Sequence, residues 1–130
     1  MVKEDEIAKM IVQSALDLHR ELGPGLLESV YEAIFANLLR EQGVEVERQV
    51  PIPIRFRGMS FDEGFRADLI VGKLVLVELK SIATLASVHR KQVITYLRLS
   101  NLKLGILINF GGELLKGNIE RLVNNLPDAQ

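Results

Sequence analysis

The chain has 130 residues, of which 48% are hydrophobic and 25% charged, and its net charge is −1. This composition is typical of a folded globular protein and argues against disorder, and the length predicts one domain over residues 1–130. The absence of cysteine excludes disulfides, thiolate metal sites and cysteine nucleophiles, and two histidines are too few for most zinc sites. Any metal would therefore be held by oxygen ligands.

The N-terminal stretch and the distribution of charge bear on location and partners. Residues 1–9 are acidic and polar where a secretory signal would be basic and then apolar, and no apolar run approaches the ~20 residues of a membrane span. We therefore expect a cytoplasmic protein without membrane association. Residues 51–110 carry a local charge of +5. This excess is compatible with a nucleic-acid partner, and a solvated basic face explains it equally well.

The first part of the chain reads as two helices. Apolar residues at spacings of three and four predict an amphipathic N-terminal helix over 5–22, which Gly23-Pro24-Gly25 ends. The helical period resumes at Leu26 and continues to Leu38, and Gly43 supplies a stop.

From residue 44 the apolar period changes to two. Residues 44–56 predict one long strand or two short ones, and Pro51 and Pro53 indicate an edge or a bulge. Residues 58–64 resemble a turn. Residues 65–71 and 73–80 follow as two strands joined at Gly72-Lys73, a short connection that predicts antiparallel pairing.

The last part returns to a helical period over residues 84–100, followed by a buried strand at 103–110. Residues 111–130 form a glycine-led tail whose structure the pattern leaves undetermined. The order of elements over the core, residues 26–110, predicts an α/β protein with a mixed central sheet flanked by helices.

Three charged residues interrupt the apolar strands near their ends. Alternation places Asp68 on one face of its strand and puts Glu78 and Lys80 together on one face of the next. Charged groups at a sheet margin are costly unless they are paired or bind a metal. A structural salt bridge between Lys80 and one of the acids is as good an explanation as a catalytic site at this point.

The two neighbouring helices add polar residues that face the predicted sheet. In the helix over 84–100, the apolar arc is centred on Leu85, Val88, Tyr96 and Leu99, with Val93 and Leu97 on its flank. The polar residues His89, Gln92 and Tyr96 lie within this arc. The basic residues lie on the opposite face: Arg90, Lys91 and Arg98. In the helix over 26–42, Glu28 lies on the flank of the apolar arc with Tyr31 one turn away, and Glu32 reads as surface charge.

These residues match a known family. Residues 25–31, "GLLESVY", fit the G-x-x-E-x-x-Y motif of the GxxExxY family, and "RADLIV", "VELK" and "KQVITYL" follow in the order of the wider PD-(D/E)XK nuclease-like superfamily. The resemblance covers residues 23 to about 110. It implies a restriction-endonuclease-like fold, with a mixed sheet flanked by helices, and nuclease activity by similarity.

The resemblance also implies roles for individual residues. Asp68 and Glu78 would hold Mg²⁺ or Mn²⁺ with the Leu79 carbonyl, because hard cations take oxygen ligands, and Glu28 would support the metal or its waters. Lys80 would position or deprotonate the attacking water and offset charge on the phosphate. Gln92, Tyr96 and Tyr31 would orient substrate or water, although Tyr96 could equally satisfy buried polar groups.

Other functional classes find less support. "GPGLLE" lacks the third glycine of a dinucleotide-binding turn and follows a helix where a strand is required, so no nucleotide cofactor is expected. No serine or histidine has the sequence context of a hydrolase triad. The leading hypothesis is a metal-dependent nuclease acting on DNA or RNA. A nuclease fold that binds nucleic acid or protein without turnover, and a purely structural polar cluster, are the alternatives. A homodimer or a partner protein would help such a small chain to grip a duplex.

Overall fold

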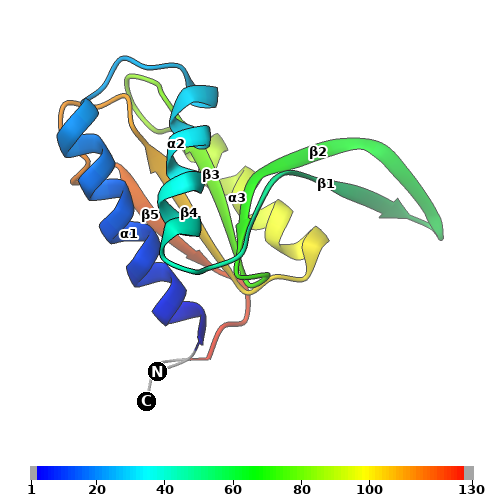
Figure 1. The fold of residues 1–130 in the computed structure, drawn as a ribbon. Helices are drawn as coiled ribbons and strands as arrows, with labels where there is room; N and C mark the ends of the chain where they lie inside the picture. The colour runs from blue at the N-terminus through cyan, green and yellow to red at the C-terminus, as the bar shows by residue number, and fades with distance from the viewer. Residues whose placement is uncertain (1–2, 128–130) are drawn as a thin grey trace.

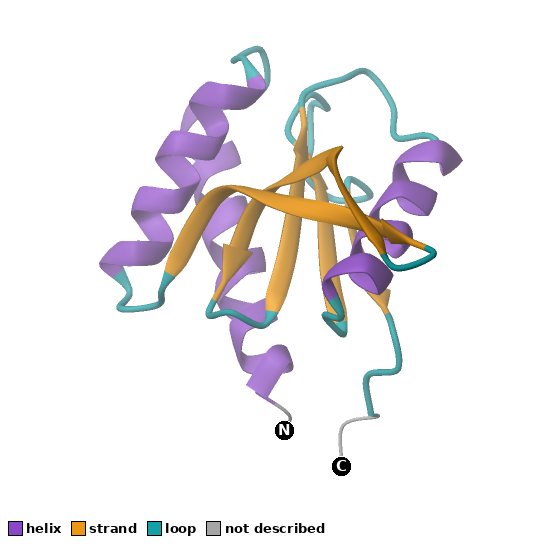
Figure 2. Ribbon diagram, turned by 90° about the vertical axis from the view of Figure 1, so that its right-hand side faces the viewer, coloured by secondary structure: helices purple, strands orange, loops and turns teal. Residues whose placement is uncertain are grey.

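A five-stranded sheet with helices on both faces forms the computed structural model, which describes residues 3–127 (Figures 1 and 2). The elements are α1 (Lys3–Leu22), α2 (Glu28–Glu41), β1 (Val46–Phe56), β2 (Met59–Val71), β3 (Val75–Lys80), α3 (Ser87–Ser100), β4 (Leu104–Asn109) and β5 (Ile119–Val123). None of the described helices is long and apolar enough to cross a membrane.

The strands lie side by side in chain order, from β1 at one edge to β5 at the other. Only β3 and β4 are parallel, and α3 forms the crossover that this pairing needs; all other neighbours are antiparallel. The predicted α/β class with a mixed sheet flanked by helices is confirmed, and the arrangement is consistent with the restriction-endonuclease-like fold that the resemblance implies.

The two faces of the sheet carry separate hydrophobic clusters. Helices α1 and α2 cover one face, against Leu69, Val77 and Ile106. Helix α3 covers the other face, where Val93 and Leu97 pack against Leu76 and Leu107. Strands β3 and β4 lie in the middle of the sheet and are buried almost throughout, which explains why they read as continuous apolar runs. The acidic side chain on β3, that of Glu78, is therefore surrounded by low-dielectric material.

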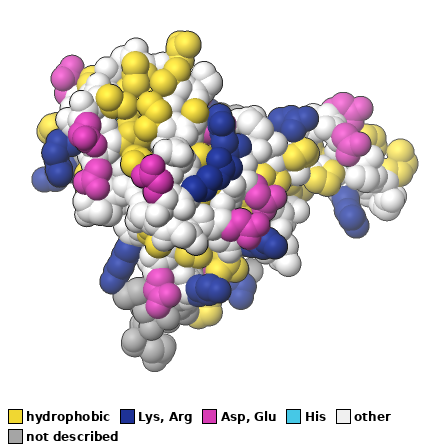
Figure 3. Space-filling model, viewed as in Figure 1, with side chains coloured by type: hydrophobic (Ala, Val, Ile, Leu, Met, Phe, Trp, Pro, Cys, Tyr) yellow, Lys and Arg dark blue, Asp and Glu magenta, His cyan; other side chains and the backbone are white. Residues whose placement is uncertain are grey.

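Strands β1 and β2 continue beyond the sheet as a two-stranded arm, the long green ribbon in Figure 1. The prediction of a turn over residues 58–64 was wrong: the turn is confined to Arg57 and Gly58, both with positive φ, and residue 59 already belongs to β2. Apolar residues of the arm remain exposed: Ile54, Phe56, Met59 and Phe61. Figure 3 shows hydrophobic side chains on the projecting arm, among side chains of both charges.

Other differences concern the third helix and the chain end. Helix α3 begins at Ser87, and its buried residues are Val93 and Leu97, which the sequence pattern placed on the flank of the apolar arc. Val88, predicted within that arc, is 53% exposed. Residues 119–123, within the predicted tail of undetermined structure, form β5 and pair with β4. Residues 128–130 of that tail lie outside the described residues.

Candidate active site

The two acids occupy the place where strands β2 and β3 separate. The regular antiparallel register between these strands runs from Val71 opposite Val75 to Leu69 opposite Val77 and goes no further. Beyond it, carboxylates replace the ladder: the Asp68 amide donates to Glu78 Oε1 at 3.1 Å, and the Leu79 amide donates to Asp68 Oδ2 at 2.7 Å. The two side chains thus satisfy backbone groups that the diverging strands leave without partners.

Burial of these acids changes their protonation. Glu78 is only 7% exposed, and its pKa is raised to about 8, first by burial and then by the charge of Asp68; the Asp68 amide and Lys80 act in the opposite direction. The pKa of Asp68 is also raised, mainly by burial, although the hydrogen bond from Leu79 lowers it. Two acids that repel each other in a buried place favour a proton or a cation between them.

Lys80 lies at the end of β3 and is half-buried. Its charge lowers the pKa of Glu78, which places it near that carboxylate, yet no carboxylate lies within ion-pair distance of its ammonium group among residues 3–127. The structural salt bridge considered from the sequence is thus absent from the described part of the chain. The Lys80 carbonyl accepts a hydrogen bond from the Phe110 amide at 2.8 Å, so the backbone at this position is fixed by the loop after β4.

Glu28 lies at the first residue of α2 and reaches the chain just after Lys80. Its Oε2 accepts a hydrogen bond from the Ser81 amide at 3.3 Å, and the Ser81 hydroxyl donates to the Leu26 carbonyl at 2.8 Å. A cleft of about 390 Å³ opens here, lined by Leu26, Leu27, Glu28, Ser29 and Ser81. Glu28 also contributes to the raised pKa of Asp68. Its carboxylate therefore faces the strand end that carries the acids.

Tyr31 is fully buried, and its ring stacks on Phe110 at a centroid distance of 4.5 Å. Its hydroxyl donates to the Gly23 carbonyl and accepts from the Leu26 amide at 3.3 Å. The residue ties the loop before α2 to the core. It can influence the site only by holding this loop, and hence Glu28, in place.

The polar residues expected from α3 are placed differently from one another. Tyr96 is half-buried and stacks on Phe65 of β2; burial and then the charges of Glu78 and Asp68 raise its pKa, so it lies beside the acids. Gln92 is exposed and forms no hydrogen bond with a described residue's side chain. His89 Nδ1 accepts a hydrogen bond from the Ala86 amide at 2.9 Å, so it caps the helix.

The sequence interpretation missed a second polar layer behind Asp68. Glu32 was read as surface charge, but it is only 5% exposed. Its carboxylate accepts from Arg48 Nε at 3.0 Å and from Gln49 Nε2 at 2.6 Å. Both partners come from β1, so no pattern within α2 could have revealed them.

A further buried polar residue, Asn109 at the end of β4, holds the loop after β3. Its side chain bonds both the amide and the carbonyl of Ile82 at 3.0 Å. The loop that follows Lys80 and Ser81 is therefore fastened to the neighbouring strand.

The donor set fits a hard divalent cation. The carboxylates of Asp68 and Glu78 are oxygen donors, and in an extended strand the carbonyl of Leu79 points to the same side as its amide, toward Asp68. Among residues 3–127, however, no three histidine or acidic side chains are gathered closely enough to hold a metal by themselves. Glu28 thus does not join the two acids as a third direct ligand in the described geometry, and a backbone carbonyl and waters would complete the coordination.

Comparison with known proteins agrees with this geometry. No curated protein and no solved structure matches the chain significantly. A model of the PD-(D/E)XK nuclease superfamily matches residues 5–122, a range that includes both acids, Lys80, the arm, strands β1 to β4 and all but the last residue of β5. The chain belongs to the PD-(D/E)XK nuclease superfamily.

Proposed function

We propose that the protein is a metal-dependent phosphodiesterase that hydrolyses DNA or RNA. The observation that supports this most is the pair of acids where β2 and β3 separate, Glu78 buried and Asp68 partly buried. Lys80 lies two residues after Glu78 on the same strand. Superfamily membership suggests a nuclease-type function for this arrangement. A site built only for stability would gain from apolar residues or from a closed ion pair here, because two like charges in a buried place cost free energy.

Each residue has a defined part in this proposal. Asp68 and Glu78, with the Leu79 carbonyl, would hold Mg²⁺ or Mn²⁺, which supplies an acidified water and offsets negative charge on the phosphate. Lys80 is free of an ion pair in the described residues, so its ammonium group can orient the attacking water and stabilise charge that develops on the phosphate oxygens. Glu28 holds the Ser81 amide and orients water in the adjoining cleft. Tyr96 lies near the two acids, whose charges contribute to its raised pKa, and could orient substrate or water there.

Cleavage assays with matched variants test the proposal. Purified protein would be incubated with Mg²⁺ or Mn²⁺ and with single- and double-stranded DNA and RNA. We expect Asp68→Asn and Lys80→Ala each to lower the rate about a hundredfold or more. Lys73→Ala serves as the control, since Lys73 is an exposed lysine in the turn before β3, at the opposite end of the strand, and its ion pair with Glu45 is also exposed. Cleavage that persists in both site variants would show that it comes from a contaminant or from another site.

The second candidate is a nuclease fold that binds nucleic acid or protein without turnover. It is favoured by the absence of a third acidic or histidine ligand near Asp68 and Glu78 in the described residues. Binding of nucleic acid in a gel-shift assay, with intact substrate after prolonged incubation with Mn²⁺, would select this alternative. Metal-dependent turnover that is lost in Lys80→Ala would dismiss it.

A further inference from the structure

Gln49 on β1 has an unusual backbone conformation. Its φ is +52°, in the left-handed region that residues other than glycine seldom occupy. The residue lies in the strand opposite Asp68, between the pairs Arg48–Leu69 and Val50–Ala67. Such a conformation costs about 1 kcal/mol or more and persists only where surrounding contacts enforce it. The contacts of the Gln49 side chain account for this backbone conformation.

The Gln49 amide lies between two carboxylates from different elements. Its Nε2 donates to Glu32 Oε1 at 2.6 Å and to Asp68 Oδ1 at 3.4 Å. An amide nitrogen carries two hydrogens, so one group can serve both acceptors. Its position thus connects the candidate site on β2 to a buried acid on α2.

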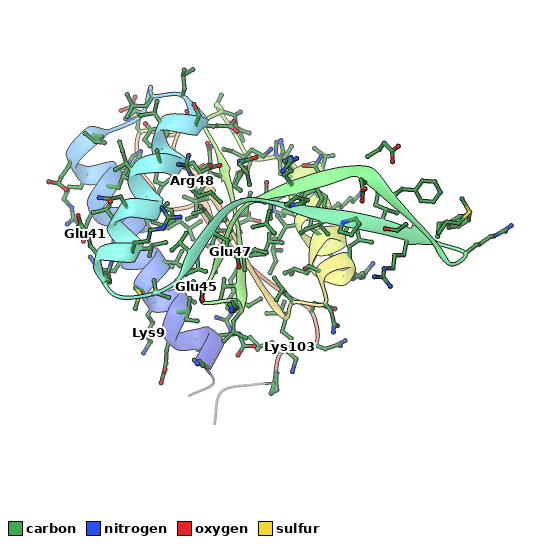
Figure 4. All side chains as sticks on the ribbon, turned by 45° about the vertical axis from the view of Figure 1, so that its right-hand side comes forward. Lys9, Glu41, Glu45, Glu47, Arg48 and Lys103 are labelled. Atoms are coloured by element: carbon green, nitrogen blue, oxygen red, sulfur yellow. The ribbon has the colours of Figure 1, made fainter. Side chains whose placement is uncertain are left out.

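Glu32 provides a rigid support for this amide. It is 5% exposed, and its second oxygen accepts from Arg48 Nε at 3.0 Å. Arg48, labelled in Figure 4, comes from β1 beside α2. Consecutive residues of β1 therefore hold both oxygens of one carboxylate, a geometry that the left-handed backbone at Gln49 makes possible. Buried side chains with satisfied hydrogen bonds have few alternative rotamers, so Glu32 fixes the position of the Gln49 nitrogen.

Asp68 receives a hydrogen bond on each oxygen as a result. The Leu79 amide contacts Oδ2 at 2.7 Å, and the Gln49 amide contacts Oδ1. A carboxylate has about four lone-pair positions, so two remain for another ligand. The rotation of the carboxylate, and with it the direction of those two positions, is set by one backbone donor and one side-chain donor.

We propose that Gln49, supported by Glu32 and Arg48, is a positioning residue that orients the Asp68 carboxylate for binding a divalent cation. This inference rests on the proposed metal-dependent function. It assigns a role to three residues that lie outside the sequence motifs of the superfamily. Groups that orient metal ligands without touching the metal commonly change metal affinity by ten- to a hundredfold when they are removed.

Two substitutions separate positioning from stability. Gln49→Gly removes the amide and relieves the left-handed backbone, so the lost hydrogen bonds and the released strain offset each other and the melting temperature changes little. Gln49→Met keeps the length of the side chain but cannot donate. Gln13→Met is the control, because Gln13 is an exposed glutamine on α1, distant in the sequence from the site, and its amide donates to the exposed Asp17.

Titration calorimetry with Mn²⁺, beside melting curves in EDTA, provides the test. We expect both Gln49 variants to bind Mn²⁺ about tenfold more weakly than the wild type, and Gln13→Met to bind like the wild type. Should one variant fail to fold, the other still reports affinity. Affinity within twofold of wild type in a folded Gln49 variant would overturn the inference, as would a wild type that binds no Mn²⁺. If the wild type binds Mn²⁺ in a manner sensitive to Gln49 but cleaves no nucleic acid, the positioning role stands and the nuclease function fails.

Discussion

Replacing Glu78 by glutamine should stabilise the metal-free protein at alkaline pH while removing the proposed nuclease activity. Glu78 is 7% exposed, and its pKa is raised from 4.5 to about 8, first by burial and then by the charge of Asp68. The folded state therefore binds a proton that the unfolded state releases, so the free energy of unfolding decreases as pH rises from about 4.5 through about 8. Glutamine keeps an oxygen for the Asp68 amide and carries no charge.

The size of the effect follows from the shift in pKa. One pKa unit corresponds to about 1.4 kcal/mol, which limits the charge penalty to about 5 kcal/mol above pH 8. Because Asp68 shares the repulsion, we expect about half of this limit, 2–3 kcal/mol. For a domain of this size, such a gain raises the melting temperature by about 6–12 °C.

Thermal unfolding followed by circular dichroism, in EDTA at pH 5 and pH 9, measures this difference. We expect Glu78→Gln to melt well above the wild type at pH 9 and close to it at pH 5. Glu47→Gln is the control, because Glu47 is exposed on β1. If Glu78→Gln is no more stable than the wild type at pH 9, burial and the charge of Asp68 do not destabilise the ionised form of Glu78. That result would refute the claim that the two acids repel each other in the folded protein.

Two further measurements address the metal and the loop before α2. Mn²⁺ at a hundred times its Kd should raise the free energy of unfolding by about 3 kcal/mol, and this gain should vanish in Asp68→Asn; equal stabilisation of both proteins would place the metal elsewhere. Tyr31→Phe leaves the Gly23 carbonyl and the Leu26 amide without their hydroxyl partner, so it should cost about 1–3 kcal/mol and speed hydrogen exchange at residues 23–27. Unchanged exchange there would show that packing of the ring, not the hydroxyl, holds the loop.

The sequence allowed the fold class and most elements to be predicted, because the buried elements have strong periodic signals. Helices α1 and α2 and strands β3 and β4 lie close to their expected bounds. The arm was misread because Asp62, Glu63 and Gly64 are typical of a turn, while two-stranded pairing outside a core leaves no burial pattern. Strand β5 was missed because it is short and only partly buried at the sheet edge.

The residues of the candidate site could be predicted only in part from the sequence pattern. Alternation within two strands was enough to bring Asp68 and Glu78 together, since neighbouring strands align their faces. Glu32 was misread because its burial depends on Arg48 and Gln49, whose approach to α2 follows from the left-handed turn of β1 at Gln49. Contacts between distant elements, fixed by one irregular backbone position, leave no periodic trace in the chain.

The anchoring of Tyr31 gives the spacing in G-x-x-E-x-x-Y a mechanical meaning. Gly25 has φ +109°, a conformation that only glycine adopts without strain, and it lies in the loop that the Tyr31 hydroxyl grips from the first turn of α2. Glu28 starts the helix between these two fixed points. In this chain the pattern therefore defines how α2 begins. Gly25 allows the chain to turn before the helix, and the Tyr31 hydroxyl holds that loop in place. Glu28 is thereby kept where its carboxylate accepts a hydrogen bond from the Ser81 amide. The three residues depend on one another, so a substitution at Gly25 or at Tyr31 should displace Glu28.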